Sequence, residues 1–306
     1  MLVIGSRGSQ LALWQARWIA SRLAERGCET RIEIIKTTGD KITDVPLAKV
    51  GTKGLFTKEI EEALLEGRID LAVHSLKDLP TELPVGLVIG AIPEREDPRD
   101  ALVGSKLDEL PAGVTVGTSS LRRAAQLRKM RPDLVMESIR GNLETRLRKL
   151  DEGQYRAIVL ASAGLTRLGW AHRISQVLEP EIMCPAVGQG ALAVETRESG
   201  YAKETCQSLD HTATRAAVTA ERAVLAALGG GCQVPIGAYA EVQDETLRLI
   251  AVVISPDGSR LVRENTGGPM QEAERLGSKL GARLLAAGAR GILEQVYSTP
   301  GRDADV

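Results

Sequence analysis

The stretch LVIGSRGSQLALWQARWIASRLAERG, residues 2–27, contains the unit on which much of the chain is built. Its first five residues predict a buried strand, and the residues after Ser9 predict an amphipathic helix. Gly27 is predicted to end that helix, because glycine commonly follows the last helical turn. A strand that leads into a helix through a short polar turn is typical of α/β proteins. The apolar face of this helix comprises Leu11, Trp14, Trp18, Ile19 and Leu23.

The same alternation continues to about residue 195. Strands are predicted at 31–35, 70–75, 114–120, 134–138, 157–161 and 191–196, and helices at 56–67, 121–130, 142–153 and 162–169. This alternation favours largely parallel sheets. The segment PEREDPRD, residues 93–100, interrupts the apolar pattern with prolines and charges and separates two α/β units. A second joint is predicted near residues 184–192.

The pattern changes in the last third of the chain. Residues 211–231 predict a helix that ends in three glycines. Residues 236–242, 246–254 and 259–266 alternate apolar and polar side chains and are separated by turn residues, which predicts an antiparallel meander of three strands. A final helix is predicted from about Pro269. This part of the chain is therefore expected to form a separate α+β domain.

Composition excludes several classes of protein. The 306 residues have a formal net charge of −1, and one Phe, three Trp and four Tyr are too few for a nucleic-acid stacking platform. No run approaches 18 uninterrupted apolar residues, and the N-terminal stretch is not typical of a signal peptide. The four cysteines lie far apart, which argues against zinc or dithiol chemistry. We expect a reduced, cytoplasmic protein that binds no metal, nucleic acid or membrane.

Several strand-to-helix junctions share one chemistry. Each offers free backbone N–H groups, hydroxyls and a guanidinium that can bind a carboxylate or phosphate with two parallel hydrogen bonds. Ser and Asn are also ordinary helix caps, and a surface Arg is usually only solvated. The recurrence at the ends of successive strands nevertheless predicts a cleft for a ligand with several anionic groups. The junctions are Ser6–Ser9, Thr118–Arg123, Arg140–Asn142 with Arg146 one turn later, and Arg167.

An acid follows the strand 70–75, within HSLKDLP at residues 74–80. A carboxylate in an arginine-lined cleft would repel an anionic ligand, so Asp78 is better suited to hold a cation or to exchange a proton. The alternative is that Asp78 pairs with Lys77 or caps the turn before Pro80. His74 is interpreted as structural.

Two glycine-rich loops are further candidates. GTKG, residues 51–54, lacks the spacing of a phosphate-binding loop, and we interpret Lys49, Lys53 and Phe56 as part of a mobile loop near the cleft, although a plain surface turn fits as well. Cys232 follows three glycines and precedes Pro235, a setting that favours a displayed thiol over a packed one. The alternative is that the glycines only end the helix and Cys232 fills a gap.

The motifs together resemble the porphobilinogen deaminase (hydroxymethylbilane synthase) family. The resemblance extends from about residue 3 to residue 300, and it is carried by SRGSQLALWQ, PLAKVGTKGLF, HSLKDLP, REDPRDA, GTSSLRR, RGNLETR, PAVGQGAL and GGGCQVPIG. The family joins four porphobilinogen molecules head to tail into a linear tetrapyrrole, on the route to haem, and releases ammonia at each addition. The resemblance therefore implies a transferase that acts on porphobilinogen.

The resemblance also implies roles for individual residues. A covalent dipyrromethane primer would be attached by a thioether to Cys232, and Asp78 would bond the pyrrole N–H groups and balance the cationic azafulvene formed when ammonia leaves. Lys53 and Phe56 match the family's mobile loop. Residues implied to bind cofactor or substrate are Arg7, Ser9, Ser75, Lys77, Thr118, Ser120, Arg122, Arg123, Arg140, Arg146, Arg167 and Gln189.

The fold implied by the resemblance has two lobes like those of periplasmic binding proteins and a C-terminal α+β domain that bears the cofactor. Residues 1–94 and 190–210 would form the first domain, 95–189 the second and 211–306 the third. We expect a monomer. A non-catalytic two-lobed binder of a small polyanion is the competing interpretation, but it leaves Asp78 and Cys232 without a task.

Overall fold

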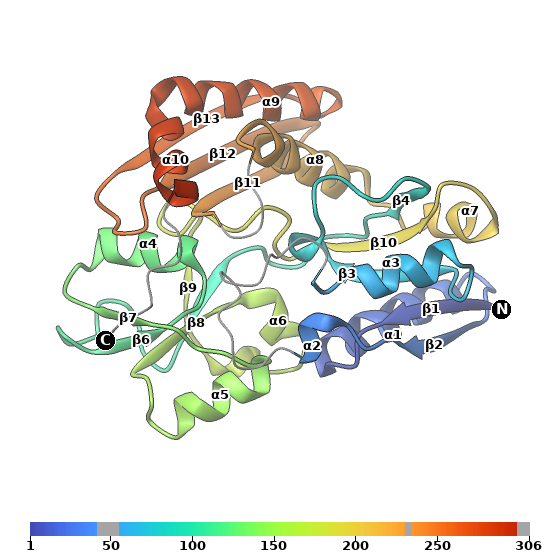
Figure 1. The fold of residues 1–306 in the computed structure, drawn as a ribbon, viewed down its shortest axis with the longest axis horizontal. Helices are drawn as coiled ribbons and strands as arrows, with labels where there is room; N and C mark the ends of the chain where they lie inside the picture. The colour runs from blue at the N-terminus through green and yellow to red at the C-terminus, as the bar shows by residue number, and fades with distance from the viewer. Residues whose placement is uncertain (42–54, 230–233, 299–306) are drawn as a thin grey trace.

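The computed structural model describes residues 1–41, 55–229 and 234–298, which form two α/β lobes and a C-terminal α+β domain (Figure 1). The first lobe is built on a five-stranded sheet of order β2-β1-β3-β10-β4. Its strands are β1 (Leu2–Ser6), β2 (Thr30–Ile34), β3 (Leu71–Ser75), β4 (Leu87–Ala91) and β10 (Leu192–Arg197). Its helices are α1 (Gln10–Ala24), α2 (Thr38–Lys41), α3 (Lys58–Leu65) and α7 (Tyr201–Gln207).

The second lobe repeats this plan with a five-stranded sheet of order β7-β6-β8-β5-β9. Its strands are β5 (Asp100–Val103), β6 (Thr115–Gly117), β7 (Val135–Glu137), β8 (Ala157–Ala161) and β9 (Ile174–Leu178). Its helices are α4 (Leu121–Met130), α5 (Leu143–Asp151) and α6 (Ser162–Arg167). The chain therefore builds two α/β units, as predicted from the repeated strand-to-helix pattern.

The sheets are mixed, although four of the five strands in each run in the same direction, in keeping with the prediction of largely parallel sheets. In the first lobe β10 lies antiparallel between β3 and β4, and in the second lobe β5 lies antiparallel to both β8 and β9. The remaining pairings, β1 with β2 and β3 and β6 with β7 and β8, are parallel. The reason is that the chain crosses between the lobes before β5 and again before β10, and each crossing delivers a strand of opposite direction.

The first lobe shows why its sequence folds as predicted. The Ser9 side chain accepts a hydrogen bond from the backbone N–H of Ala12 and caps α1. Ile19 and Leu23 of the predicted apolar face are fully buried against Ile4 of β1. Burying a side chain of this size contributes about 1.5 to 3 kcal/mol. The packed helix therefore holds the carboxyl end of β1, where Ser6 and Arg7 lie.

The C-terminal domain contains the predicted three-stranded antiparallel sheet, of order β11-β12-β13. These strands are β11 (Ile236–Gln243), β12 (Thr246–Ile254) and β13 (Leu261–Pro269), and the helices packed against them are α8 (Thr212–Ala227) and α9 (Ala273–Leu284). Asp244 and Glu245 both have positive φ, as a two-residue hairpin turn requires. The predicted single final helix is divided, because Gly288 has a φ of 105° and separates α9 from α10 (Arg290–Ser298).

A buried ion pair joins the three parts of the molecule. Arg95 lies on the segment that leads from β4 to β5, and its guanidinium donates to Glu221 of α8 at 2.6 and 3.1 Å. Glu221 also accepts from the backbone N–H groups of Gly188, on the returning segment, and Ala240, on β11. Both crossing segments are thereby attached to the C-terminal domain. The residue limits predicted for the three domains stay a prediction.

Candidate functional site

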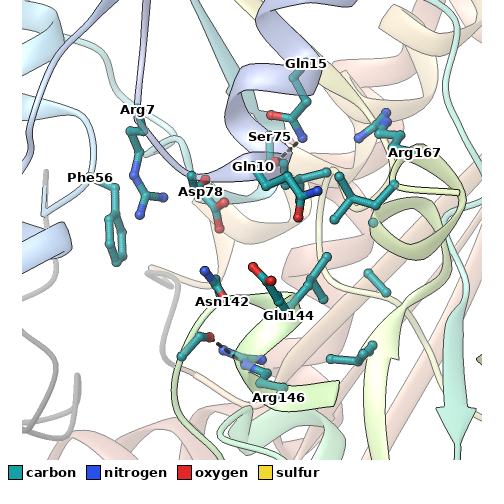
Figure 2. Close-up of a pocket in the computed structure, with 18 of the residues that line it drawn as sticks. Arg7, Gln10, Gln15, Phe56, Ser75, Asp78, Asn142, Glu144, Arg146 and Arg167 are labelled. Atoms are coloured by element: carbon teal, nitrogen blue, oxygen red, sulfur yellow. Dashed lines mark hydrogen bonds between the residues drawn. The ribbon is translucent and has the colours of Figure 1, made fainter. Parts of the chain in front are cut away.

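A cavity of about 1040 Å³ lies between the two lobes (Figure 2). The first lobe contributes the turns that follow β1 and β3, and the second lobe contributes the turns at the start of α5 and α6. The cavity thus lies where strands of both sheets end, the position predicted from the strand-to-helix junctions. Its volume suits a ligand at the upper end of the range for small molecules.

On the first-lobe side, six of the predicted residues line the cavity. The Arg7 guanidinium lies 4.2 Å from the centre of the Phe56 ring, a cation–π contact that brings the start of α3 against the end of β1. Ser75, at the end of β3, accepts a hydrogen bond from Gln15 of α1 at 2.9 Å. Ser9, Lys77 and Asp78 complete this wall. Asp78 ends a short 3₁₀ turn, Leu76–Asp78, that follows β3 directly.

On the second-lobe side, four predicted arginines line the cavity, of which Arg140, Arg146 and Arg167 lie at the start of α5 and on α6. Asn142 caps α5 by accepting from the backbone N–H of Thr145 at 2.8 Å, and this places Arg146 in the first turns of the helix. Arg146 Nε donates to the backbone oxygen of Gly141 at 2.9 Å, and Arg167 at the end of α6 donates to that of Gly190 at 2.6 Å. Arg140 precedes the cap and also lines the cavity.

Among the residues that the structure describes, Arg140, Arg146 and Arg167 form no ion pair with a carboxylate at hydrogen-bond distance. Burial lowers the pKa of Arg146 to about 10, and the positive charges of Arg123 and Arg140 act in the same direction. Burial also lowers the pKa of Arg167 to about 10. Within the described part of the chain, Arg140 makes no side-chain hydrogen bond or ion pair. An anionic ligand would supply the missing negative charge and remove part of this electrostatic cost.

Positive charge dominates the cavity wall. Among the described residues that line the cavity, the cations are Arg7, Lys36, Lys77, Arg123, Arg140, Arg146, Lys149 and Arg167. Asp78 and Glu144 are the acids among the same lining residues, and Figure 2 shows both on the cavity wall. Sequence reasoning singled out Asp78 but missed Glu144, because an acid in the first turn of a helix is ordinary. The arrangement can bind several anionic groups while presenting a carboxylate to a cationic centre.

Arg122 does not line the cavity, contrary to its predicted role in direct ligand binding. Its guanidinium is buried and donates to Asp100 Oδ2 at 2.7 Å and to the backbone oxygen of Cys184 at 2.6 Å. Arg123 lines the cavity, but its Nε and Nη2 atoms donate to Asp100 Oδ1 at 2.9 and 2.7 Å. The physical reason is that the buried Asp100 carboxylate forms an ion pair with both guanidinium groups.

Asp100 is a further residue near this site that the sequence reasoning missed. Burial alone would raise the pKa of its carboxyl, but the Arg122 and Arg123 guanidinium groups outweigh burial and hold that pKa well below its usual range. Gln189 also donates to Asp100 Oδ1, at 2.8 Å, and to the backbone oxygen of Pro98 at 2.7 Å. Asp100 lies within the motif REDPRDA, at the end of the segment 93–100 that separates the two α/β units. An acid at this position was the signal in the sequence that could have identified Asp100 as a functional residue.

Gln189, Thr118 and Ser120 likewise lie outside the cavity lining. Gln189 is buried on the returning segment. Thr118 accepts from the backbone N–H of Ser120, and Ser120 caps α4 by accepting from the backbone N–H of Arg123. These residues therefore support the turn that carries Arg123. His74 is structural as interpreted, since it is buried and its Nε2 lies 2.9 Å from Glu195 Oε2.

Three predicted residues, Lys49, Lys53 and Cys232, lie outside the described residues. The other cysteines, Cys28, Cys184 and Cys206, are buried free thiols. Burial raises the pKa of Cys184 and Cys206 to about 12, which leaves very little thiolate near neutral pH. The described residues include no group of metal-binding side chains and no helix long and apolar enough to cross a membrane.

The two lobes surround a cavity with many cationic side chains, which places the chain in the class of proteins that enclose an anionic small molecule. The Asp78 carboxylate in the same cavity is a group that can stabilise a cation. Residues 2–205 match the family model for the porphobilinogen deaminase dipyrromethane cofactor-binding domain, and residues 215–286 match the porphobilinogen deaminase C-terminal domain. This chain belongs to the porphobilinogen deaminase family.

Curated relatives cover nearly the whole chain. A porphobilinogen deaminase of Geobacter metallireducens is 54% identical over 97% of this chain and 95% of its own length. One of Pelotomaculum thermopropionicum is 53% identical over 99% of each. Among solved structures, a Coxiella burnetii periplasmic substrate-binding protein of an ABC transporter has a TM-score of 0.43 and 13% identity, covering 68% of this chain and 92% of that one.

Proposed function

We propose that this chain joins four porphobilinogen molecules head to tail into a linear tetrapyrrole, hydroxymethylbilane, and releases ammonia at each addition. The observation that carries the proposal is the position of Asp78 in a cavity whose other charged lining residues are mostly cations. Each porphobilinogen ring bears an acetate and a propionate, and loss of its amino group leaves a cation. The cavity provides charges of the sign that each of these groups requires.

The residues present fit a dipyrromethane cofactor. A group with several carboxylates would compensate the guanidinium groups of Arg140, Arg146 and Arg167, which lack a carboxylate partner among the described residues. These residues, with Arg7, Ser9 and Ser75, would hold the carboxylates and place the rings along the cavity. When bound, the dipyrromethane supplies the pyrrole carbon to which the first substrate ring is joined.

We infer that Cys232 attaches this cofactor through a thioether. The support is chemical, because Cys28, Cys184 and Cys206 are buried, and a thioether requires an accessible thiol. In the sequence, Cys232 lies between α8 and β11, and three glycines precede it. A loop of that composition has the backbone freedom to present a thiol.

Asp78 would act on the substrate directly. Its carboxylate would accept hydrogen bonds from pyrrole N–H groups and stabilise the positive charge left when ammonia departs. Lys77 would bind a substrate carboxylate on the same wall. Phe56, held against Arg7, would close the first-lobe side, and Lys49 and Lys53 would extend that closure.

The role proposed for Arg122, Gln189, Thr118 and Ser120 is indirect. Arg122 and Gln189 hold Asp100, and Asp100 holds Arg123 at the cavity wall. Thr118 and Ser120 hold the turn at the start of α4. Substitution of any of these four residues should therefore affect ligand binding indirectly, by changing the position of Arg123.

Intact-mass measurement of the purified chain tests the proposal. The wild type should carry the added mass of a dipyrromethane and release ammonia from porphobilinogen. Cys232→Ser should lose the added mass and most of the activity, because a hydroxyl is a much weaker nucleophile than a thiol near neutral pH. Cys28→Ser, Cys184→Ser and Cys206→Ser are the matched controls, and each should keep the mass. An adduct on one of those three, or binding of porphobilinogen without ammonia release, would contradict the proposal.

We further propose that the enzyme acts as a cytoplasmic monomer without a nucleic-acid partner. Support comes from the near-zero net charge and the small number of aromatic residues. Light scattering at several protein concentrations tests the oligomeric state, and a mass of 32.8 kDa plus the cofactor is expected.

A further inference from the structure

The turn that carries Asp78 is held by an arginine from another domain. Arg222 lies on α8, and its guanidinium reaches the backbone just beyond Asp78. Nη2 donates to the backbone oxygen of Pro80 at 2.7 Å and to that of Thr81 at 3.0 Å, and Nη1 lies 3.4 Å from that of Leu79. One side chain thus contacts three consecutive carbonyl groups.

These contacts hold residues 79–81, a short segment that belongs to no helix or strand. β3 ends at Ser75, the 3₁₀ turn covers Leu76–Asp78, and the backbone N–H of Leu79 donates to the oxygen of Leu76. Beyond Leu79 the chain leaves the turn in an extended conformation. Asp78 is exposed in the cavity, so its position depends on how the backbone on either side is held. The three carbonyl contacts follow Asp78 directly.

The part of helix α8 that carries Arg222 is held in place by the contacts of its neighbour in the sequence. The preceding residue, Glu221, is fully buried and binds Arg95 and the backbone N–H groups of Gly188 and Ala240. Helix α8 is therefore attached to both segments that cross between the lobes. The same helix ends at Ala227, five residues before Cys232. One helix thus contacts the segment that follows Asp78 and ends, in sequence, shortly before the proposed attachment site.

We propose that Arg222 is a positioning residue, which sets the place of the Asp78 carboxylate relative to the domain that holds the growing chain. This inference rests on the proposed function. Arg222 is absent from the cavity lining, so it acts through the backbone of residues 79–81 and not by contact with substrate. A planar guanidinium suits this task, because it offers several N–H donors in a fixed geometry.

Arg222→Gln and Arg222→Lys test the inference, with ammonia release measured over a range of porphobilinogen concentrations. Misplacement of a reacting group by about 1 Å can cost on the order of 100-fold in rate. We expect kcat of Arg222→Gln to fall at least tenfold, on the order of 10- to 100-fold, with KM nearly unchanged and the cofactor mass retained. Arg222→Lys keeps the charge but not the donor geometry, so its kcat should be intermediate. Guanidinium ion at a non-denaturing concentration should raise the kcat of Arg222→Gly.

Arg215→Gln is the matched control. Arg215 lies on the same helix and also reaches first-lobe carbonyl groups, those of Ile89 and Gly90, but these belong to β4 and not to the segment that follows Asp78. Its kcat should stay close to that of the wild type. An equal loss of kcat in Arg215→Gln and Arg222→Gln, or a wild-type kcat in Arg222→Gln and Arg222→Lys, would overturn the inference. A wild type without turnover would instead contradict the proposed function.

Discussion

At the scale of single residues, charge compensation separates the arginines into two groups. Arg122 and Arg123 share the buried carboxylate of Asp100, whereas Arg140, Arg146 and Arg167 line the cavity without a carboxylate ion pair among the residues that the structure describes. The first group holds the cavity wall, and the second is the group that we propose binds the ligand. Removing Asp100 would leave two buried positive charges, a more severe change than removing one ligand-binding arginine.

Asp78→Asn is expected to abolish most turnover while keeping the cofactor. The amide preserves shape and part of the hydrogen bonding but not the negative charge, and loss of one preorganised electrostatic group typically lowers kcat on the order of 100- to 1000-fold. Ammonia release gives kcat, and intact mass reports the cofactor. Glu82→Gln, an exposed acid four residues away and outside the cavity lining, is the control. Near-normal ammonia release by Asp78→Asn would show that another group balances the cation.

Lys77 is expected to make substrate binding depend on pH. Burial lowers its pKa to about 8, against the opposing effect of Asp78. The side chain is therefore positively charged below about pH 8 and loses its charge as the pH rises through that value. KM for porphobilinogen should then rise about two- to fivefold, as expected for loss of a partly exposed ion pair. Lys77→Arg stays charged, so its KM should not change across this range; the same inflection in that variant would exclude Lys77 as its source.

At the scale of secondary-structure elements, close approach of α8 and α9 stabilises the domain that carries Cys232. A Cβ atom on Gly277 would lie 2.2 Å from the backbone oxygen of Ala220 and 2.7 Å from Ala223 Cβ. Any side chain at this position of α9 would therefore overlap α8, and the two helices can pack this closely only because residue 277 is glycine. The packing of α8 matters for function because the same helix carries Glu221 and Arg222.

Gly277→Ala should therefore destabilise the protein by about 1 to 3 kcal/mol, the usual cost of an added methyl group in a packed core. Gly291→Ala is the matched control, since no heavy atom lies within 4 Å of its added Cβ. That change should be neutral or stabilising by up to about 1 kcal/mol, because alanine favours a helix interior. Urea unfolding followed by circular dichroism measures both, and similar midpoints for the two variants would refute the helix-contact argument.

At the scale of the whole molecule, the Arg95–Glu221 pair joins both crossing segments to the C-terminal domain. Both side chains are at most 9% exposed, so removing one leaves the other charge buried without its partner. The two lobes and the third domain therefore depend on one another through α8. This arrangement attaches the segment that follows Asp78 to the C-terminal domain.

Arg95→Met is expected to lower the free energy of unfolding by about 3 to 5 kcal/mol. The double variant Arg95→Met/Glu221→Gln should recover part of this loss, because the uncompensated charge is removed. Arg148→Met breaks an exposed pair with Glu152 and should cost at most about 1 kcal/mol. Chemical denaturation of the four proteins measures these values, and equal losses from Arg95→Met and Arg148→Met would contradict a structural role for the buried pair.

Local sequence patterns predicted much of the fold and the chemistry of the cavity. Strand and helix positions follow from the periodicity of apolar residues, because that periodicity reports which face of an element is buried. The carboxyl ends of the strands carry Arg7, Asp78 and Arg140, and all three line the cavity. The motifs also identified the family. A glycine-flanked thiol and a lone acid among arginines were recognisable because residue type alone constrains their chemistry.

Contacts between residues far apart in the sequence determined the strand directions and which arginines pair with a buried carboxylate. The direction of β5 and β10 depends on how the chain crosses between the lobes, which a strand pattern does not encode. Whether an arginine serves a ligand or the fold depends on whether a buried carboxylate can reach it, and Asp100 reaches Arg122 from 22 residues away along the chain. Hydrophobic patterning acts within an element, whereas charge pairing and strand direction arise only when distant elements pack together.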